Sequence, residues 1–169
     1  MQALPAQIDD MHLKSAAQLL LKAERILVCG TGHAAALASL LALRLARSGY
    51  RAQGLDRWDW RTMEALATMR KNDVLITVTL RRMSKPAAKL MEHAKELGIR
   101  SLVVSDVAGF KPQPDVVLCA HRGQEGESQS LTVPMAICNA LVLEVARLDQ
   151  GKSMKALADL TQLRRSLPD

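Results

Sequence analysis

Short continuous apolar runs alternate with amphipathic segments along the whole chain. The apolar runs lie at about 25–29, 51–55, 74–79, 101–105 and 116–120. Apolar residues recur at helical spacing over about 6–23, 34–48, 58–69, 85–97, 131–148 and 153–166. A strand that is covered on both faces has a continuous apolar sequence rather than an alternating one. The pattern therefore predicts an α/β fold with three αβα layers, in which helices cover both faces of a doubly wound parallel sheet of about five strands.

The boundaries of these segments carry their own signals. Pro86 stands in the first turn of the helix expected at about 85–97, and Gly98 follows its last residue, which is the usual asymmetry of helix ends. No repeat or linker interrupts the 169 residues. We therefore expect a single domain over residues 1–169, with an N-terminal helix at about 6–23, a sheet core at 25–148 and a C-terminal helix at about 153–166.

Composition narrows the class of protein. Aromatic residues make up only 2% of the chain and hydrophobic residues 49%, so the core must be aliphatic. No apolar run approaches the roughly 18 residues that span a bilayer, and no secretory signal is recognisable. The three cysteines lie inside apolar runs, as expected for reduced thiols in a cytoplasmic protein. No spacing of Cys or His typical of a metal site occurs, and we expect no metal and no cofactor.

The formal net charge of +6 raises the question of whether the chain binds nucleic acid. The basic residues are scattered along the predicted helices, and aromatic residues for base stacking are nearly missing. No helix-turn-helix unit is predicted before the first strand. We therefore interpret the charge as a solvated basic surface and expect no membrane binding and no direct DNA binding by this domain.

The loop Gly30-Thr31-Gly32-His33-Ala34 follows the first predicted strand and opens a helix. In doubly wound sheets, ligands bind beyond the carboxyl ends of the strands. Glycine lets backbone amides approach an anion, and the helix N-terminus adds partial positive charge. Gly30, Gly32 and His33 are therefore candidates for phosphate binding. The loop also matches the loose dinucleotide fingerprint, with Asp56 placed to hold a ribose, so binding of NAD is an alternative.

A second loop, at 79–84, lies between the most convincing predicted strand and the helix at about 85–97. It offers the hydroxyl groups of Thr79 and Ser84, the guanidinium groups of Arg81 and Arg82, and a helix N-terminus. Arginine forms charge-assisted and often bidentate hydrogen bonds with phosphate. The loop therefore indicates a phosphate monoester as ligand. The structural alternative is that Ser84 only caps the helix and the arginines are solvated.

The order of elements and these two loops resemble the SIS (sugar isomerase) domain family, which has a flavodoxin-like fold. The family pattern is Gly-x-Gly-x-Ser in the first loop and Ser-x-Ser-Gly-x-Thr in the second. In an ungapped alignment from Asp73 to Gly98, Thr79 and Arg81 take the places of the two serines, Arg82 that of the glycine and Ser84 that of the threonine. Ala34 replaces the serine of the first loop. The basic second loop is most similar to the effector-binding domain of RpiR-type transcription regulators.

The resemblance implies a non-catalytic sensor of a phosphorylated sugar, so our interpretation leans away from an enzyme. It implies that Ser128 and Ser130 help to hold the sugar and that the chain forms a homodimer or homotetramer. DNA binding would belong to a separate helix-turn-helix domain.

The enzymatic alternative is an aldose–ketose isomerase similar to the hexulose-phosphate isomerases of the same family. Such a reaction needs a base, for which Glu125 and Glu127 are candidates, and an acid, for which His33 and His121 are candidates. Each also has a structural interpretation, as a capping or strand-end residue. Trp58 and Trp60 could line a sugar pocket, but we expect them to anchor a helix or an interface.

Overall fold

Five parallel strands form the sheet in the computed structural model, which describes residues 9–123 and 129–167. The strand order is β2-β1-β3-β4-β5, and every neighbouring pair is parallel. The strands are β1 (Ile26–Gly30), β2 (Ala52–Leu55), β3 (Val74–Thr79), β4 (Arg100–Ser105) and β5 (Val116–Cys119). The predicted fold class is confirmed, and each strand lies within one residue of its expected bounds.

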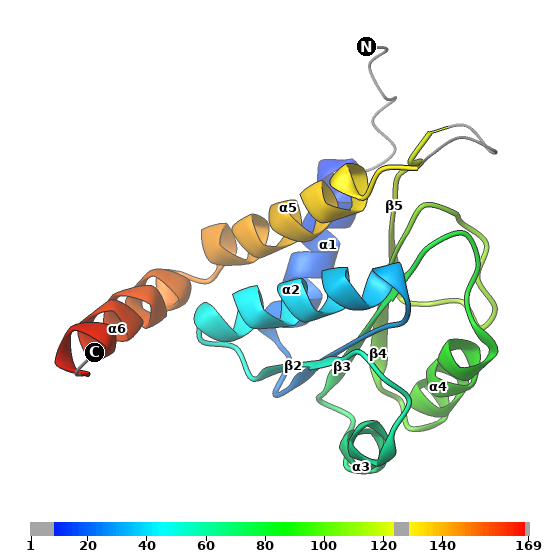
Figure 1. The fold of residues 1–169 in the computed structure, drawn as a ribbon, viewed down its shortest axis with the longest axis horizontal. Coiled ribbons are helices and arrows are strands. Elements are labelled where there is room, and N and C mark those ends of the chain that lie inside the picture. Colours follow the sequence, from blue (N-terminus) through cyan, green and yellow to red (C-terminus); the bar gives the residue numbers. More distant parts are fainter. Residues whose placement is uncertain (1–8, 124–128, 168–169) are drawn as a thin grey trace.

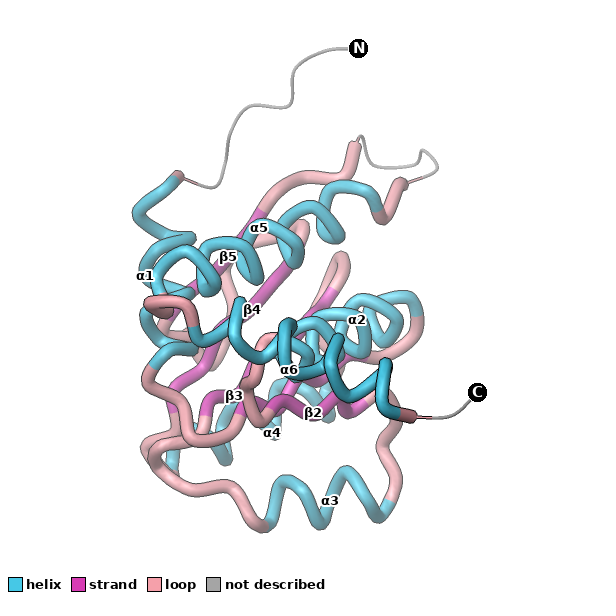
Figure 2. Tube along the Cα trace, turned by 90° about the vertical axis from the view of Figure 1, so that its left-hand side faces the viewer, coloured by secondary structure: helices cyan, strands magenta, loops and turns pink. Residues whose placement is uncertain are grey.

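The described residues form six helices, of which α1 to α5 cover the two faces of this sheet (Figure 1). They are α1 (Asp10–Leu21), α2 (His33–Arg47), α3 (Trp60–Ala67), α4 (Lys85–Glu96), α5 (Thr132–Leu148) and α6 (Lys152–Ser166). Buried side chains of α1, α2 and α5 pack on one face in an aliphatic cluster that includes Leu20, Leu41 and Leu141. Those of α3 and α4 pack on the other face, on Leu27, Leu75 and Val103. The three layers are seen from the side in Figure 2.

Side-chain caps explain where several helices begin. Asp9, Asp59 and Ser84 each accept a hydrogen bond from the backbone N–H three residues further on, so α1, α3 and α4 start directly after them. The expected start of the third helix at about residue 58 is therefore wrong by two residues. Trp58 lies before the cap and packs, partly buried, against the core beside α3 and α4. Trp60 is the first helical residue and is 83% exposed.

The strand order reverses at β1, which has β2 on one side and β3 on the other. Gly30, at the end of β1, lies opposite Val78 of β3, so the loops that follow these two strands leave the same edge of the sheet. Crossovers run in opposite directions from such a switch point, and the space between the two loops is the usual ligand position in this architecture.

Only the first turn of α6 is anchored to the rest of the chain. Ser153 is its single buried residue, and the helix extends away from the body of the molecule in Figure 1. Met154, Leu163 and Leu167 are each more than half exposed along it or just beyond its end. Within the ranges that the structure describes, no helix is both long and apolar enough to cross a membrane.

Candidate functional site

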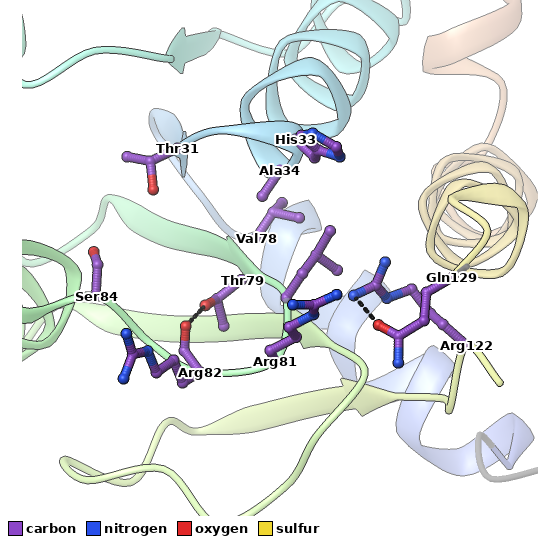
Figure 3. Close-up of a pocket in the computed structure, with 11 residues that line it drawn as sticks. Thr31, His33, Ala34, Val78, Thr79, Arg81, Arg82, Ser84, Arg122 and Gln129 are labelled. Atoms are coloured by element: carbon purple, nitrogen blue, oxygen red, sulfur yellow. Dashed lines mark hydrogen bonds between the residues drawn. The ribbon is translucent and has the colours of Figure 1, made fainter. Parts of the chain in front are cut away.

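A pocket of about 490 Å³ opens between the loops that follow β1 and β3, at the switch point (Figure 3). Its lining comes from the loop after β1, the end of β3 with the loop that follows it, and the segment after β5: Thr31, His33, Ala34, Val78, Thr79, Leu80, Arg81, Arg82, Ser84, Arg122 and Gln129. Five residues that the sequence singled out for phosphosugar binding, namely His33, Thr79, Arg81, Arg82 and Ser84, are among them.

The glycines after β1 shape the pocket wall without lining it. A Cβ atom on Gly30 would lie 2.5 Å from the carbonyl oxygen of Ala34, so only glycine lets α2 begin this close to the strand. Gly32 has a φ of 60° and is the N-cap of α2, where no side chain caps the helix. His33 therefore stands at the first helical position with its side chain at the pocket, close to the uncapped N-terminus of α2.

The loop after β3 is a tight turn that presents two arginines. Arg81 has a φ of 69°, a conformation rare for a residue other than glycine. The backbone N–H of Arg82 donates to the Leu80 carbonyl at 2.9 Å, and the Thr79 hydroxyl donates to the Arg82 carbonyl at 3.0 Å. The Thr79 proton therefore closes the turn, which leaves this hydroxyl as an acceptor rather than a donor to a phosphate in this conformation.

Ser84 ends the turn and starts α4. Its Oγ accepts a hydrogen bond from the Ala87 N–H at 3.3 Å, which confirms the capping interpretation. An oxygen that accepts in a cap still has its own proton to donate, and Ser84 also lines the pocket. The two interpretations are compatible, because one hydroxyl can cap α4 and donate to an anion at the same helix N-terminus.

A buried carboxylate ties together the segments that follow β3, β4 and β5. Asp106, which directly follows β4, accepts a hydrogen bond at Oδ1 from the backbone N–H of Arg81 at 2.6 Å. Its Oδ2 accepts from Nε of Arg122 at 2.7 Å, and both side chains of this ion pair are 6% exposed. Nη2 of Arg122 also donates to Oε1 of Gln129 at 2.9 Å. The Arg122 side chain is thereby fixed at the pocket by partners from two different segments.

The described part of the pocket is strongly cationic. Three guanidinium groups line it, from Arg81, Arg82 and Arg122, and none of its described lining residues is acidic. The Asp106 carboxylate behind Arg122 offsets one of these charges. The N-termini of α2 and α4 add the partial positive charge of their backbone dipoles. An arrangement with this excess of positive charge suits an anionic ligand.

Several residues that the sequence predicted for the site do not line this pocket. Gly30, Gly32 and His121 do not line the pocket, and His121 is exposed. Oγ of Ser130 accepts from the backbone N–H of Thr132 at 3.1 Å, so it serves the start of α5. The predicted base candidates Glu125 and Glu127 and the predicted sugar ligand Ser128 lie outside the described residues. Trp58, Trp60 and Asp56 are likewise absent from the lining.

Sequence reasoning missed Arg122, Gln129 and Asp106. Each lies just beyond a strand or before a helix at the edge where ligands bind, and that position was the available signal. Nothing in the sequence indicates which acid meets which base, because Asp106 and Arg122 follow different strands and meet only when β4 pairs with β5.

A second pocket, of about 290 Å³, lies at the opposite edge of the sheet. It is bounded by the end of α4, the start of β4 and the residues just before β5, among them Lys95, Arg100 and Asp115. Asp115 pairs with Arg100 at 3.0 Å and accepts from the Ser101 N–H at 2.7 Å, so the charges of these two side chains offset each other.

The comparisons with known proteins concern the sequence family and the fold of the chain. The family model described as SIS domain matches residues 19–144, which include both loops of the pocket. The comparison with curated protein sequences finds no match to the chain. Many solved structures share the fold. The sugar isomerase domain of an RpiR transcription factor from Sphaerobacter thermophilus has a TM-score of 0.84 and 25% identity, over 92% of this chain and 88% of that one.

Two further structures are described differently, one by its bound ligand and the other by an inferred enzymatic function. The Vibrio vulnificus NanR protein, solved with ManNAc-6P, has a TM-score of 0.79 and 18% identity, over 93% of this chain and 61% of that one. A Methanococcus jannaschii protein, for which a 3-hexulose-6-phosphate isomerase function is inferred, has a TM-score of 0.67 and 15% identity, over 89% of this chain and 88% of that one. These two likenesses concern the fold alone.

Proposed function

This chain belongs to the SIS domain family, and from that premise we propose that it binds a phosphorylated sugar in the pocket at the switch point as a sensor, without turnover. The observation that carries the proposal is the charge of that pocket. Three guanidinium groups line the pocket and the Asp106 carboxylate pairs with one of them, that of Arg122, which leaves two positive charges in excess among the described residues of the site. A phosphate monoester carries about −1.5 to −2 charges at neutral pH and matches this excess.

The phosphate group binds at the side of the pocket where Ser84 and Arg82 lie. The hydroxyl proton of Ser84 and the N-terminus of α4 donate to its oxygens, and the Arg82 guanidinium adds charge-assisted hydrogen bonds. Thr79 contributes by holding the turn through its bond to the Arg82 carbonyl rather than by touching the phosphate. The sugar then extends toward His33 and Gln129.

The sensor interpretation is supported by the residues that line the pocket. Aldose–ketose isomerisation needs a base and usually an acid at the reacting carbons. Among the described lining residues, His33 is the one side chain whose ordinary pKa lies near neutrality, and no carboxylate accompanies it. Likeness to an RpiR transcription factor domain supports the same interpretation. The second candidate is an isomerase with His33 as the acid, which the position of His33 at the pocket favours.

A thermal-shift screen followed by a turnover assay tests the proposal. The purified protein is heated with hexose, pentose and amino-sugar phosphates, with their unphosphorylated parents, and with NAD. A ligand that binds only the folded chain stabilises it by about 2.7 kcal/mol at a hundredfold excess over Kd. We expect stabilisation by a phosphosugar and not by its parent. Each compound that binds is then incubated with the protein and followed by NMR, where a new sugar signal would identify an isomerase and no change supports a sensor.

We also propose that the chain associates with a second copy of itself. Exposed apolar side chains lie near both ends of α6, at Met154, Leu163 and Leu167, and a second copy could cover them. Sedimentation analysis of the wild type and of Met154→Glu/Leu163→Glu tests this. We expect an oligomer that the double variant converts to a monomer, and a wild-type monomer at high concentration would contradict it.

A further inference from the structure

The pocket has cationic side chains at two separate ends. In Figure 3, Arg82 lies with Ser84 on one side, whereas Arg81 and Arg122 lie on the other with their guanidinium groups turned toward each other. A single phosphate held at the Ser84 end leaves the guanidinium groups of Arg81 and Arg122 to another part of the ligand.

Arg81 and Arg122 are both positioned by Asp106, but that carboxylate neutralises only one of them. Its Oδ2 pairs with Nε of Arg122 at 2.7 Å, whereas its Oδ1 meets only the backbone N–H of Arg81 at 2.6 Å. Asp106 thus fixes the backbone from which the exposed Arg81 side chain starts without offsetting that side chain's charge. Two like charges facing each other across a pocket repel, and an anion bound between them removes that repulsion.

Donors remain at this end for such an anion. The bonds of Arg122 to Asp106 and Gln129 use two of the five N–H groups that a guanidinium carries. Gln129 accepts the Arg122 bond with its carbonyl oxygen, and its NH₂ group donates to none of the residues that the structure describes. Two guanidinium groups and an amide are a donor set that suits a carboxylate, which accepts bidentate bonds from arginine.

We infer that the Arg81–Arg122 end binds a carboxylate on the phosphorylated sugar, so that the ligand class is a phosphorylated sugar acid. This inference rests on the proposed function of the pocket, since it assigns the phosphate to the Ser84 end. A neutral sugar would offer only hydroxyl groups there, and these leave unmatched the Arg81 charge, which Asp106 does not offset.

Pairs of acyclic sugar phosphates that differ only at the carbon farthest from the phosphate group test this inference. One pair is 6-phosphogluconate and sorbitol 6-phosphate, and the other is 5-phosphoribonate and ribitol 5-phosphate. In each pair a carboxylate replaces a CH₂OH group while the phosphate stays the same. Titration calorimetry on the full chain measures the four affinities. We expect the acid of at least one pair to bind at least about tenfold more tightly than its alditol, because hydrogen bonds to charged groups are the stronger ones.

Two matched arginine variants locate the effect. Arg81→Gln keeps a long polar side chain at an exposed position, and we expect it to remove the preference for the acid, because it should weaken the acid at least about tenfold more than the alditol phosphate. Arg82→Gln, one residue away on the same turn, should weaken both members of a pair by the same factor. Unchanged thermal unfolding of both variants establishes that each is folded.

Each outcome is decisive. Equal affinities within both pairs overturn the carboxylate site and leave the phosphate function of the pocket standing. A preference for the acid that survives Arg81→Gln and disappears in Arg82→Gln also overturns it, because the carboxylate would then lie at the wrong end. No binding by any of the four compounds overturns this inference, whereas the proposed function falls only if the thermal-shift screen finds no phosphosugar that binds.

Discussion

Nε of Arg122 donates to Oδ2 of Asp106 across 2.7 Å, and both side chains are 6% exposed. The pair joins the segments that follow β4 and β5, and the second oxygen of Asp106 holds the backbone of Arg81 in the loop after β3. One carboxylate therefore connects three of the loops around the pocket. The first prediction follows from this connection.

Replacing Asp106 by Asn removes the charge that Arg122 faces while keeping an oxygen that can accept from Arg81. Removing one partner of a buried ion pair leaves an uncompensated charge, so we expect the free energy of unfolding to fall by about 3 kcal/mol. Phosphosugar affinity should fall as well, because Arg122 loses the charged partner that places it at the pocket. Urea unfolding and calorimetry measure the two effects.

Asp115→Asn is the matched control for that variant. Asp115 also pairs with an arginine and accepts a backbone N–H, but it lies at the opposite edge of the sheet. We expect it to lower stability without changing affinity. Equal loss of affinity in both variants would mean that Asp106 acts only through general stability.

Ser84→Ala separates capping from ligand binding. Loss of an N-cap side chain costs about 1 kcal/mol, and the same change removes a hydroxyl donor from the pocket. We expect a modest loss of stability together with a clear loss of phosphosugar affinity. Asp59→Ala removes the equivalent cap from α3, away from the pocket, and should lower stability alone. If Ser84→Ala binds as the wild type does, the phosphate is not held by this serine.

Gly30→Ala tests how closely α2 approaches β1. The added Cβ would meet the backbone oxygen of Ala34 at 2.5 Å, and backbone cannot move aside as a side chain can. Gly32→Ala adds a Cβ with nothing within 4 Å, and its cost, about 1–2 kcal/mol, comes from the positive φ. We expect Gly30→Ala to be the less stable of the two by urea unfolding. A Gly30→Ala variant as stable as the wild type would show that the loop tolerates a wider path.

The carboxylate of Asp149 should make the free energy of unfolding depend on pH. Burial acts to raise the pKa of its carboxyl, but hydrogen bonds from Ser153, Tyr50 and Gly151 outweigh burial and lower that pKa. A depressed folded pKa means that the stabilisation is present above the unfolded pKa of about 3.9 and is lost as pH falls through the folded value. Asp149→Asn should therefore lower the free energy of unfolding by roughly 1 kcal/mol at neutral pH.

That difference between the wild type and Asp149→Asn should shrink in acid, below about pH 4. Urea unfolding at several pH values follows it, and a difference that stays constant or grows in acid would show that the carboxylate charge is not what stabilises this junction of α5 and α6.

The sequence alone predicts the layers of this fold, because the periodicity of apolar residues is local information. Val74–Thr79 reads as a buried strand, and in the structure every one of its residues is buried. The pocket is predictable in part for the same reason, since Thr79, Arg81, Arg82 and Ser84 follow that strand directly. Asp106 and Arg122 could be found only once the order of the strands was known, because their contact spans two strand ends. The exposure of Met154 and Leu163 could not be predicted either, since Met154, Leu157, Leu160 and Leu163 have the spacing of a packed helix.

The most direct test of the central claim is to find where a phosphate group binds. Inorganic phosphate is titrated into isotope-labelled protein, and the backbone amide signals are followed by NMR. The account predicts shifts around Thr31–His33 and at Met83–Lys85, where the loops after β1 and β3 meet the N-termini of α2 and α4. The same shifts, lost in Arg82→Gln, would place the anion at the proposed end of the pocket. Shifts confined to the second pocket near Arg100, or no shift at any phosphate concentration, would contradict it.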